Sequence, residues 1–187
     1  MSGFDPIRSF RKLAYNNALA NVRLHQACAT LQPGEFEATR VSFFPSIKST
    51  LNHILTVDWF YVDALEGGTL GLKAFDIEEP YDRLDELTTQ QMEVDRRLVA
   101  FCDELTSETV VQIVSIERTG RVQQERADDV LTHLFQHQTH HRGQVHAMLA
   151  GTSVAPPQLD EFVVADDARF RREELAALSW DETKLMR

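Results

Sequence analysis

The sequence has few cysteines, no long apolar run and no excess of positive charge, and each absence excludes a class of protein. Only Cys28 and Cys102 occur in 187 residues, which is too few for a disulfide framework and typical of a reduced, cytoplasmic chain. No apolar run approaches the roughly 18 residues of a membrane span, and the first residues lack a signal-peptide pattern. We therefore expect a cytoplasmic protein with no membrane partner, in which both cysteines are structural.

Positive charge is scarce as well. The formal net charge is −10 and the sequence pI is about 5.1. Binding to nucleic acid needs a basic surface, so this charge argues against a nucleic-acid partner. The chain also lacks an internal repeat, a linker and a low-complexity segment, and 187 residues are enough for one sizeable core. We expect residues 1–187 to form a single domain.

What the sequence does have is helical periodicity. Apolar residues recur at helical spacing in four segments, which predicts an all-α four-helix bundle. The expected helices span about 6–31, 46–66, 81–105 and 127–150. Asp5 and Pro6 form a start signal for the first helix, which we expect to bury Leu13 on its core face. The first and third helices carry broad apolar faces, one of which a partner subunit could cover.

Two shorter segments depart from this pattern. The β-branched run 109–116, a turn at 117–120 and the run 121–125 predict a small β-hairpin between helices three and four. We expect Arg118 in this hairpin to be a solvated edge charge. After Pro156-Pro157, we expect the tail to pack on the bundle, to form a short helix and to end in loose residues.

The fourth predicted helix is rich in histidine. It contains five of the seven histidines: His133, His137, His140, His141 and His146. His141 lies in the middle of an apolar arc, and His137 lies one turn earlier, about 40° away on the same face. Two imidazoles at i and i+4 can chelate one metal ion. The alternative is a histidine-rich helix whose rings bond only to water or carbonyls.

His53, on the second predicted helix, is a candidate third ligand. Three histidines leave a coordination position open, as in catalytic zinc sites, whereas structural sites close the shell with a fourth ligand. Asp58, His133, His140 and Gln144 remain alternatives for a fourth ligand or a supporting contact. Asp58 would then accept a hydrogen bond or handle a proton near the site, or it would be a solvated surface charge. His53 alone would more often be a core histidine.

The ion expected at such a site is divalent. Zinc is the default for three imidazoles because it is the commonest ion in such sites, although nickel, iron and copper also suit them. Ligating imidazoles must be neutral, so protons compete with the ion. We therefore expect the metal-loaded protein to lose stability below roughly pH 6 and the metal-free protein to lack this step.

Three stretches carry a resemblance to a known family. Asn52-His53-Ile54, His137-Gln-Thr-His-His-Arg-Gly-Gln-Val-His146 and Pro156-Pro157-Gln-Leu-Asp160 resemble the DinB family, within the DinB/YfiT-like superfamily. The resemblance implies a four-helix bundle, commonly a homodimer, that binds a divalent metal through His53, His137 and His141. The chain departs from the family at Leu19, where many members carry tryptophan.

The resemblance implies two functions of different classes. Relatives in the superfamily include S-transferases that depend on low-molecular-weight thiols, which suggests a metal-dependent transferase or hydrolase acting on a small molecule, such as a thiol. A metal ion with an open position suits this chemistry because it lowers the pKa of a bound thiol or water. The alternative is a non-catalytic metal-binding stress-response protein. We identify no catalytic residue in the sequence besides the candidate ligands.

Overall fold

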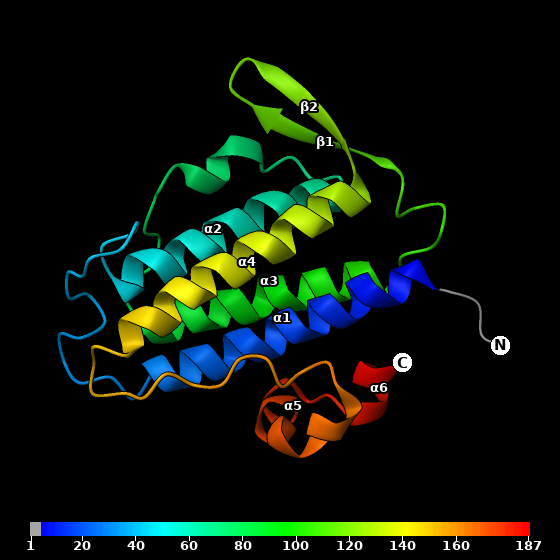
Figure 1. Ribbon diagram of the computed structural model, residues 1–187. Coiled ribbons are helices and arrows are strands. Elements are labelled where there is room, and N and C mark those ends of the chain that lie inside the picture. The colour runs from blue at the N-terminus through cyan, green and yellow to red at the C-terminus, as the bar shows by residue number, and fades with distance from the viewer. Residues whose placement is uncertain (1–4) are drawn as a thin grey trace.

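Four long helices form the body of the protein in the computed structural model, which describes residues 5–187 (Figure 1). They are α1 (Pro6–Cys28), α2 (Ile47–Leu65), α3 (Leu84–Asp103) and α4 (Ala127–Leu149). In Figure 1, α2 and α4 form one layer and α1 and α3 the other, and each helix of one layer contacts the other layer. The apolar core lies between the layers, which confirms the predicted bundle. Within the described part of the chain, no helix is both long enough and apolar enough to cross a membrane.

The helix starts follow from their capping residues. The Asp5 carboxylate accepts a hydrogen bond from the Ile7 amide at 3.0 Å, and a proline occupies the first turn of α1. Ser46 caps α2 by accepting from the Ser49 amide at 3.0 Å. These caps confirm the expected starts of the first two helices. The first helix ends at Cys28, slightly earlier than the sequence predicts.

The predicted hairpin is confirmed between α3 and α4. Strands β1 (Ile113–Arg118) and β2 (Arg121–Arg126) pair antiparallel and lie beside the short 3-10 helix η1 (Gly71–Phe75). The prediction for Arg118 is wrong, because its guanidinium lies 4.9 Å from the centroid of the Phe60 ring and donates to the Tyr61 hydroxyl at 3.1 Å. The hairpin packs against α2, so the Arg118 guanidinium lies against the aromatic rings of α2 and not in solvent alone.

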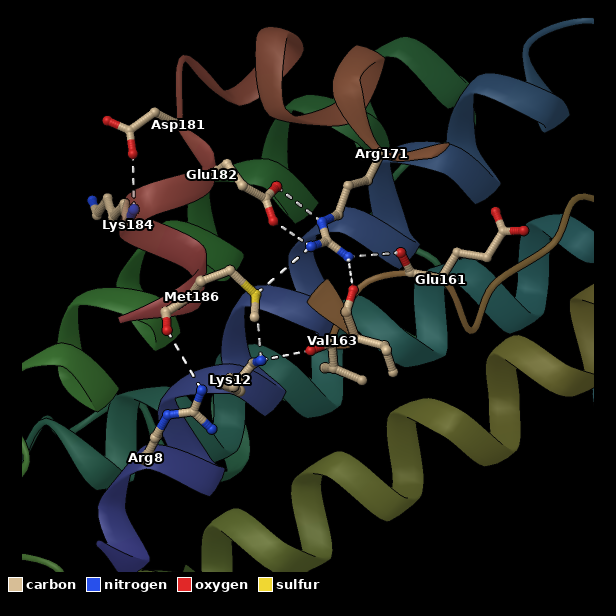
Figure 2. Close-up of polar contacts among 10 residues, drawn as sticks. Arg8, Lys12, Glu161, Val163, Arg171, Asp181, Glu182, Lys184 and Met186 are labelled. Atoms are coloured by element: carbon tan, nitrogen blue, oxygen red, sulfur yellow. Dashed lines mark hydrogen bonds and ion pairs between the residues drawn. The ribbon is translucent and has the colours of Figure 1, made fainter. Parts of the chain in front are cut away.

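The tail is more ordered than expected. It contains η2 (Ala165–Phe170), α5 (Arg172–Leu178) and α6 (Glu182–Met186), which lie on the outer side of α1 (Figure 1). The fully buried Arg171 guanidinium pairs with Glu182 (Figure 2). It also donates to the Val164 carbonyl at 2.7 Å. Lys12 Nζ donates to the Val163 carbonyl at 2.5 Å. The expectation of loose final residues is therefore wrong.

The buried face of α1 also differs from the expected one. Leu13 was predicted to be buried but is 38% exposed, whereas Tyr15 and Leu19 are fully buried. Tyr15 packs edge to face with Trp180 of the tail, with ring centroids 4.9 Å apart. Because the chain's own tail covers α1, this helix does not offer the spare apolar face that the sequence suggested for a partner subunit.

Candidate metal centre

Three histidine rings converge between α2 and α4. His53 comes from α2, and His137 and His141 come from consecutive turns of α4. The Nε2 atoms of His53 and His137 lie 3.0 Å apart, and candidate ligand atoms of all three rings lie within 4.8 Å of one another. Two nitrogen ligands of a tetrahedral zinc ion are about 3.3 Å apart, given Zn–N distances of about 2.0–2.1 Å. The spacing of the rings therefore fits one shared ion.

The helices bring the rings together for simple reasons. In Figure 1, α2 and α4 lie side by side and run in opposite directions, so the first half of α2 meets the second half of α4. The buried residues Ile54, Leu134 and Val145 fix which side of each helix faces the core. With those faces fixed, His137 and His141, four residues apart, lie on the side that meets His53.

Gln144 sets the orientation of His141. Its side-chain oxygen lies 2.8 Å from His141 Nδ1, and its side-chain nitrogen lies 3.2 Å from His140 Nε2. The oxygen can only accept, so Nδ1 of His141 carries the proton and Nε2 is left free to bind an ion. Gln144 thus contacts a candidate ligand directly, whereas the sequence left its role open. His140 is exposed and outside the cluster.

Burial keeps the cluster neutral. Desolvation, followed by repulsion from neighbouring histidines, lowers the pKa of His137 to about 3 and that of His53 to about 4. Desolvation also lowers the pKa of His141. The Nδ1 atom of His137 is buried and has no hydrogen-bond partner among residues 5–187, so no contact offsets the desolvation of this nitrogen. All three imidazoles are therefore uncharged at neutral pH, the form that binds a metal.

The other candidates do not join the cluster. His133 is exposed on α4, with its ring centroid 6.2 Å from that of His137. Asp58 is neither a solvated charge nor a hydrogen-bond partner of the histidines. It is buried in the core and accepts hydrogen bonds from Gln91, at 2.7 Å, and Gln138. Among the described residues, the group with metal-ligand geometry consists of three histidines, which leaves a position open on a tetrahedral ion.

A buried polar layer lies directly beneath the site. The Asp95 carboxylate accepts hydrogen bonds at 3.0 Å from the amides of Asn17 and Asn21, and both amide oxygens accept from the Arg142 guanidinium. Gln91 joins Asp95 to Asp58. Asn17 and Asn21 are spaced one helical turn apart on α1, but their partners lie on other helices and could not be identified from the sequence.

The layer is tied to the site through α4. Gln138 follows His137 and bonds to Asp58, while Arg142 follows His141 and bonds to the asparagines. Each candidate ligand on α4 is therefore adjacent to a residue anchored in the core. These anchors hold the rotation of α4 that directs His137 and His141 toward His53.

The cysteines lie outside this chemistry. Both are buried and free. Burial raises the pKa of the Cys28 thiol to about 12 and also raises that of Cys102. Thiols with raised pKa values are poor nucleophiles and poor metal ligands at neutral pH, which fits the structural role expected for them.

Comparisons with known proteins agree with this architecture. The model of the DinB family matches residues 7–175. Protein DinB of Bacillus subtilis (strain 168) is 25% identical over 153 residues, which cover 78% of this chain and 88% of that protein. A crystal structure of a DinB-like protein from Bacillus cereus has a TM-score of 0.58 at 17% identity, covering 77% of this chain and 90% of its own. A second crystal structure, of a DinB-like protein from Bacillus subtilis, has a TM-score of 0.52 at 17% identity. The match covers 79% of this chain and 92% of that protein's chain. At such identity, the solved structures show a shared fold.

Proposed function

Because this chain belongs to the DinB family, we propose that it is a metal-dependent enzyme in which His53, His137 and His141 bind one divalent ion. The observation that carries the proposal is the convergence of three neutral imidazoles, two of them with facing Nε2 atoms 3.0 Å apart. Zinc is the ion we expect, and nickel, iron and copper suit the same ligands.

The reaction class follows from the open position. A divalent ion held by three histidines lowers the pKa of a thiol or water that reaches it. The chain's own residues keep the histidines neutral, hold the His141 tautomer through Gln144 and line a pocket on one side of His53. We infer a thiol-dependent S-transferase or a hydrolase that acts on a small molecule, with a low-molecular-weight thiol as the candidate co-substrate.

An activity screen tests this inference. Zinc-loaded protein purified without a histidine tag is incubated with a panel of thiols and a generic aryl halide electrophile, and thioether formation is followed. We expect turnover that falls more than about a hundredfold in His137→Ala and is retained in His146→Ala. A protein that binds zinc tightly, transfers no thiol and hydrolyses no test ester would support the non-catalytic metal-binding stress-response protein instead.

The pH dependence of stability provides a second prediction. The pKa values of His53, His137 and the buried His25 are lowered to about 4, 3 and 4, below the unfolded value of about 6.5. The unfolded histidines therefore take up protons first, and metal-free protein should lose stability as pH falls from about 6.5 toward 4. The raised pKa values of the buried Asp58 and Asp95, about 8 and about 6, offset part of this loss because the folded state binds their protons more tightly. This prediction differs from the expectation drawn from the sequence, that only metal-loaded protein shows an acid step, because the buried histidines should produce one without an ion.

The effect of the ion appears as a difference between two melting curves. Zinc should raise the melting temperature at pH 7.5, and this increase should shrink as pH falls to 5, because protons displace the ion. Thermal melts with zinc or with a chelator, from pH 8 to 5, measure the difference. An increase that stays constant down to pH 5 would contradict ligation by histidine.

We also propose that the protein is a homodimer, as the family resemblance implies. Since the tail covers α1, the interface should involve other surfaces, such as the exposed Val41 and Phe43 or the hairpin residues Ile113 and Val122. Light scattering at micromolar concentration should give twice the chain mass of 21.3 kDa. A mass equal to that of one chain would contradict the proposal.

A further inference from the structure

A pocket of about 470 Å³ opens beside the histidine cluster, and its lining differs in chemistry from one wall to the other. His53 forms part of the lining, so a ligand in this pocket lies next to the candidate metal centre. The volume falls within the range of about 300–1,000 Å³ that is typical of small-molecule sites. Its lining consists of Phe44, Pro45, Ser49, His53, Thr56, Phe75, Glu78 and Glu79.

Two walls of the pocket are aromatic. The Phe44 ring lies 4.2 Å from the His53 ring and 5.5 Å from the His141 ring, measured between centroids, and belongs to the loop that precedes α2. The Phe75 ring comes from η1 and packs on Phe60 with centroids 5.0 Å apart. Phe75 is 36% exposed, so it retains surface that a ligand can cover. These rings suit an apolar or aromatic ligand body.

The lining also contains two carboxylates, Glu78 and Glu79, beside the hydroxyl groups of Ser49 and Thr56. The segment 76–82, to which both carboxylates belong, contains no lysine or arginine. Glu79 and Asp82 share one lysine, since Lys48 Nζ lies 3.0 Å from Glu79 and 2.9 Å from Asp82. Glu78 is exposed and has no ion pair within residues 5–187. Lys48 balances only one of these carboxylates, so this part of the lining retains negative charge.

We propose that this pocket binds the organic substrate of the proposed enzyme, and that this substrate has an aromatic or apolar body and a cationic ammonium group. The body packs against Phe44 and Phe75, and the ammonium group lies near Glu78. Cations are attracted both to carboxylates and to the faces of aromatic rings, so both walls favour the same charge. The inference rests on the proposed function for its catalytic meaning, but the ligand preference can be measured separately.

Two small ligands of matched shape test the preference. Phenethylammonium and 3-phenylpropionate both carry a phenyl ring and a two-carbon spacer, but their charges are opposite. NMR titration of the zinc-loaded protein at pH 7 and low salt should show phenethylammonium binding about tenfold more tightly, with a ratio that falls as salt is added. Equal binding, tighter binding of 3-phenylpropionate or no binding of either ligand would overturn the proposal.

Three variants assign the preference to this pocket. Glu78→Gln should reduce the affinity ratio from about tenfold to about threefold, because one carboxylate is removed. Phe75→Ala should weaken both ligands and leave the ratio unchanged. Glu93→Gln, which removes an exposed carboxylate from α3, is the matched control and should change neither. A ratio unaffected by Glu78→Gln would also overturn the proposal.

Metal analysis of the same samples separates the two proposals. If the protein holds no zinc, the proposed metal enzyme fails, and the titration of metal-free protein still decides the ligand preference. If zinc is bound and 3-phenylpropionate binds at least as tightly as phenethylammonium, the pocket inference fails while the metal centre stands.

Discussion

Replacing His137 with alanine is expected to lower the affinity of the protein for zinc by more than about a hundredfold, since changes to residues that merely support a ligand already cost about 10–100-fold. The effect is large because the three rings form a compact triangle, with the centroid of His137 5.0 Å from that of His53 and 4.3 Å from that of His141, so its loss removes one of three ligands. Competition with a chromophoric zinc chelator at pH 7.5 measures the affinity. His53→Ala and His141→Ala should behave in the same way.

The same helix provides the control. His146→Ala removes an imidazole that is not part of the cluster, so the affinity should not change. His140→Ala should have a smaller effect than the ligand variants, because His140 lies outside the cluster and contacts only His141, by its ring edge and through Gln144. Circular dichroism of the metal-free variants separates ligand loss from unfolding. An unchanged affinity in a folded His137→Ala protein would contradict the assignment of this ligand.

Replacing Arg142 with methionine is expected to destabilise the protein by about 3–5 kcal/mol, the usual cost of leaving buried charge without its partner. Arg142 is 5% exposed and is held by Asn17 and Asn21, which also bond to the Asp95 carboxylate. Without the guanidinium, the asparagine oxygens lose a donor, and the buried Asp95 carboxylate loses its nearby positive charge. Urea unfolding of metal-free protein measures the loss.

Two comparisons test the cause. Arg172→Met removes an exposed arginine of α5 and should change stability little. Burial raises the pKa of Asp95 to about 6, so the folded state binds this proton more tightly than the unfolded state does. Protonation should therefore relieve part of the Arg142→Met penalty as pH falls from 7 toward 5. A penalty that is independent of pH would indicate lost packing rather than lost charge.

The periodicity of apolar residues predicted both the helical bundle and the histidine cluster, because it shows which side of each helix faces the core. The buried residues of α2 and α4 set the inward face of each helix, and His53, His137 and His141 lie on those faces. The hairpin was predictable from its β-branched strand and from Gly120, which has a φ of +73° in the turn.

Features that depend on contacts between distant segments were not predictable. Asp58 could not be assigned to the core from its spacing, because its partners Gln91 and Gln138 lie on two other helices. The order of the tail depends on Arg171, whose contacts with Glu182 and Val164 form only in the folded chain. Phe44 lies in an aperiodic loop, and nothing in the local pattern places its ring against His53.

The most direct test of the metal centre is the anomalous diffraction of zinc-loaded crystals, measured on either side of the zinc absorption edge. The account predicts one strong peak per chain between the rings of His53, His137 and His141, at about 2.0–2.1 Å from a nitrogen of each. A peak elsewhere on α4, or none at this cluster in protein loaded with excess zinc, would contradict the proposal that these three histidines bind the ion.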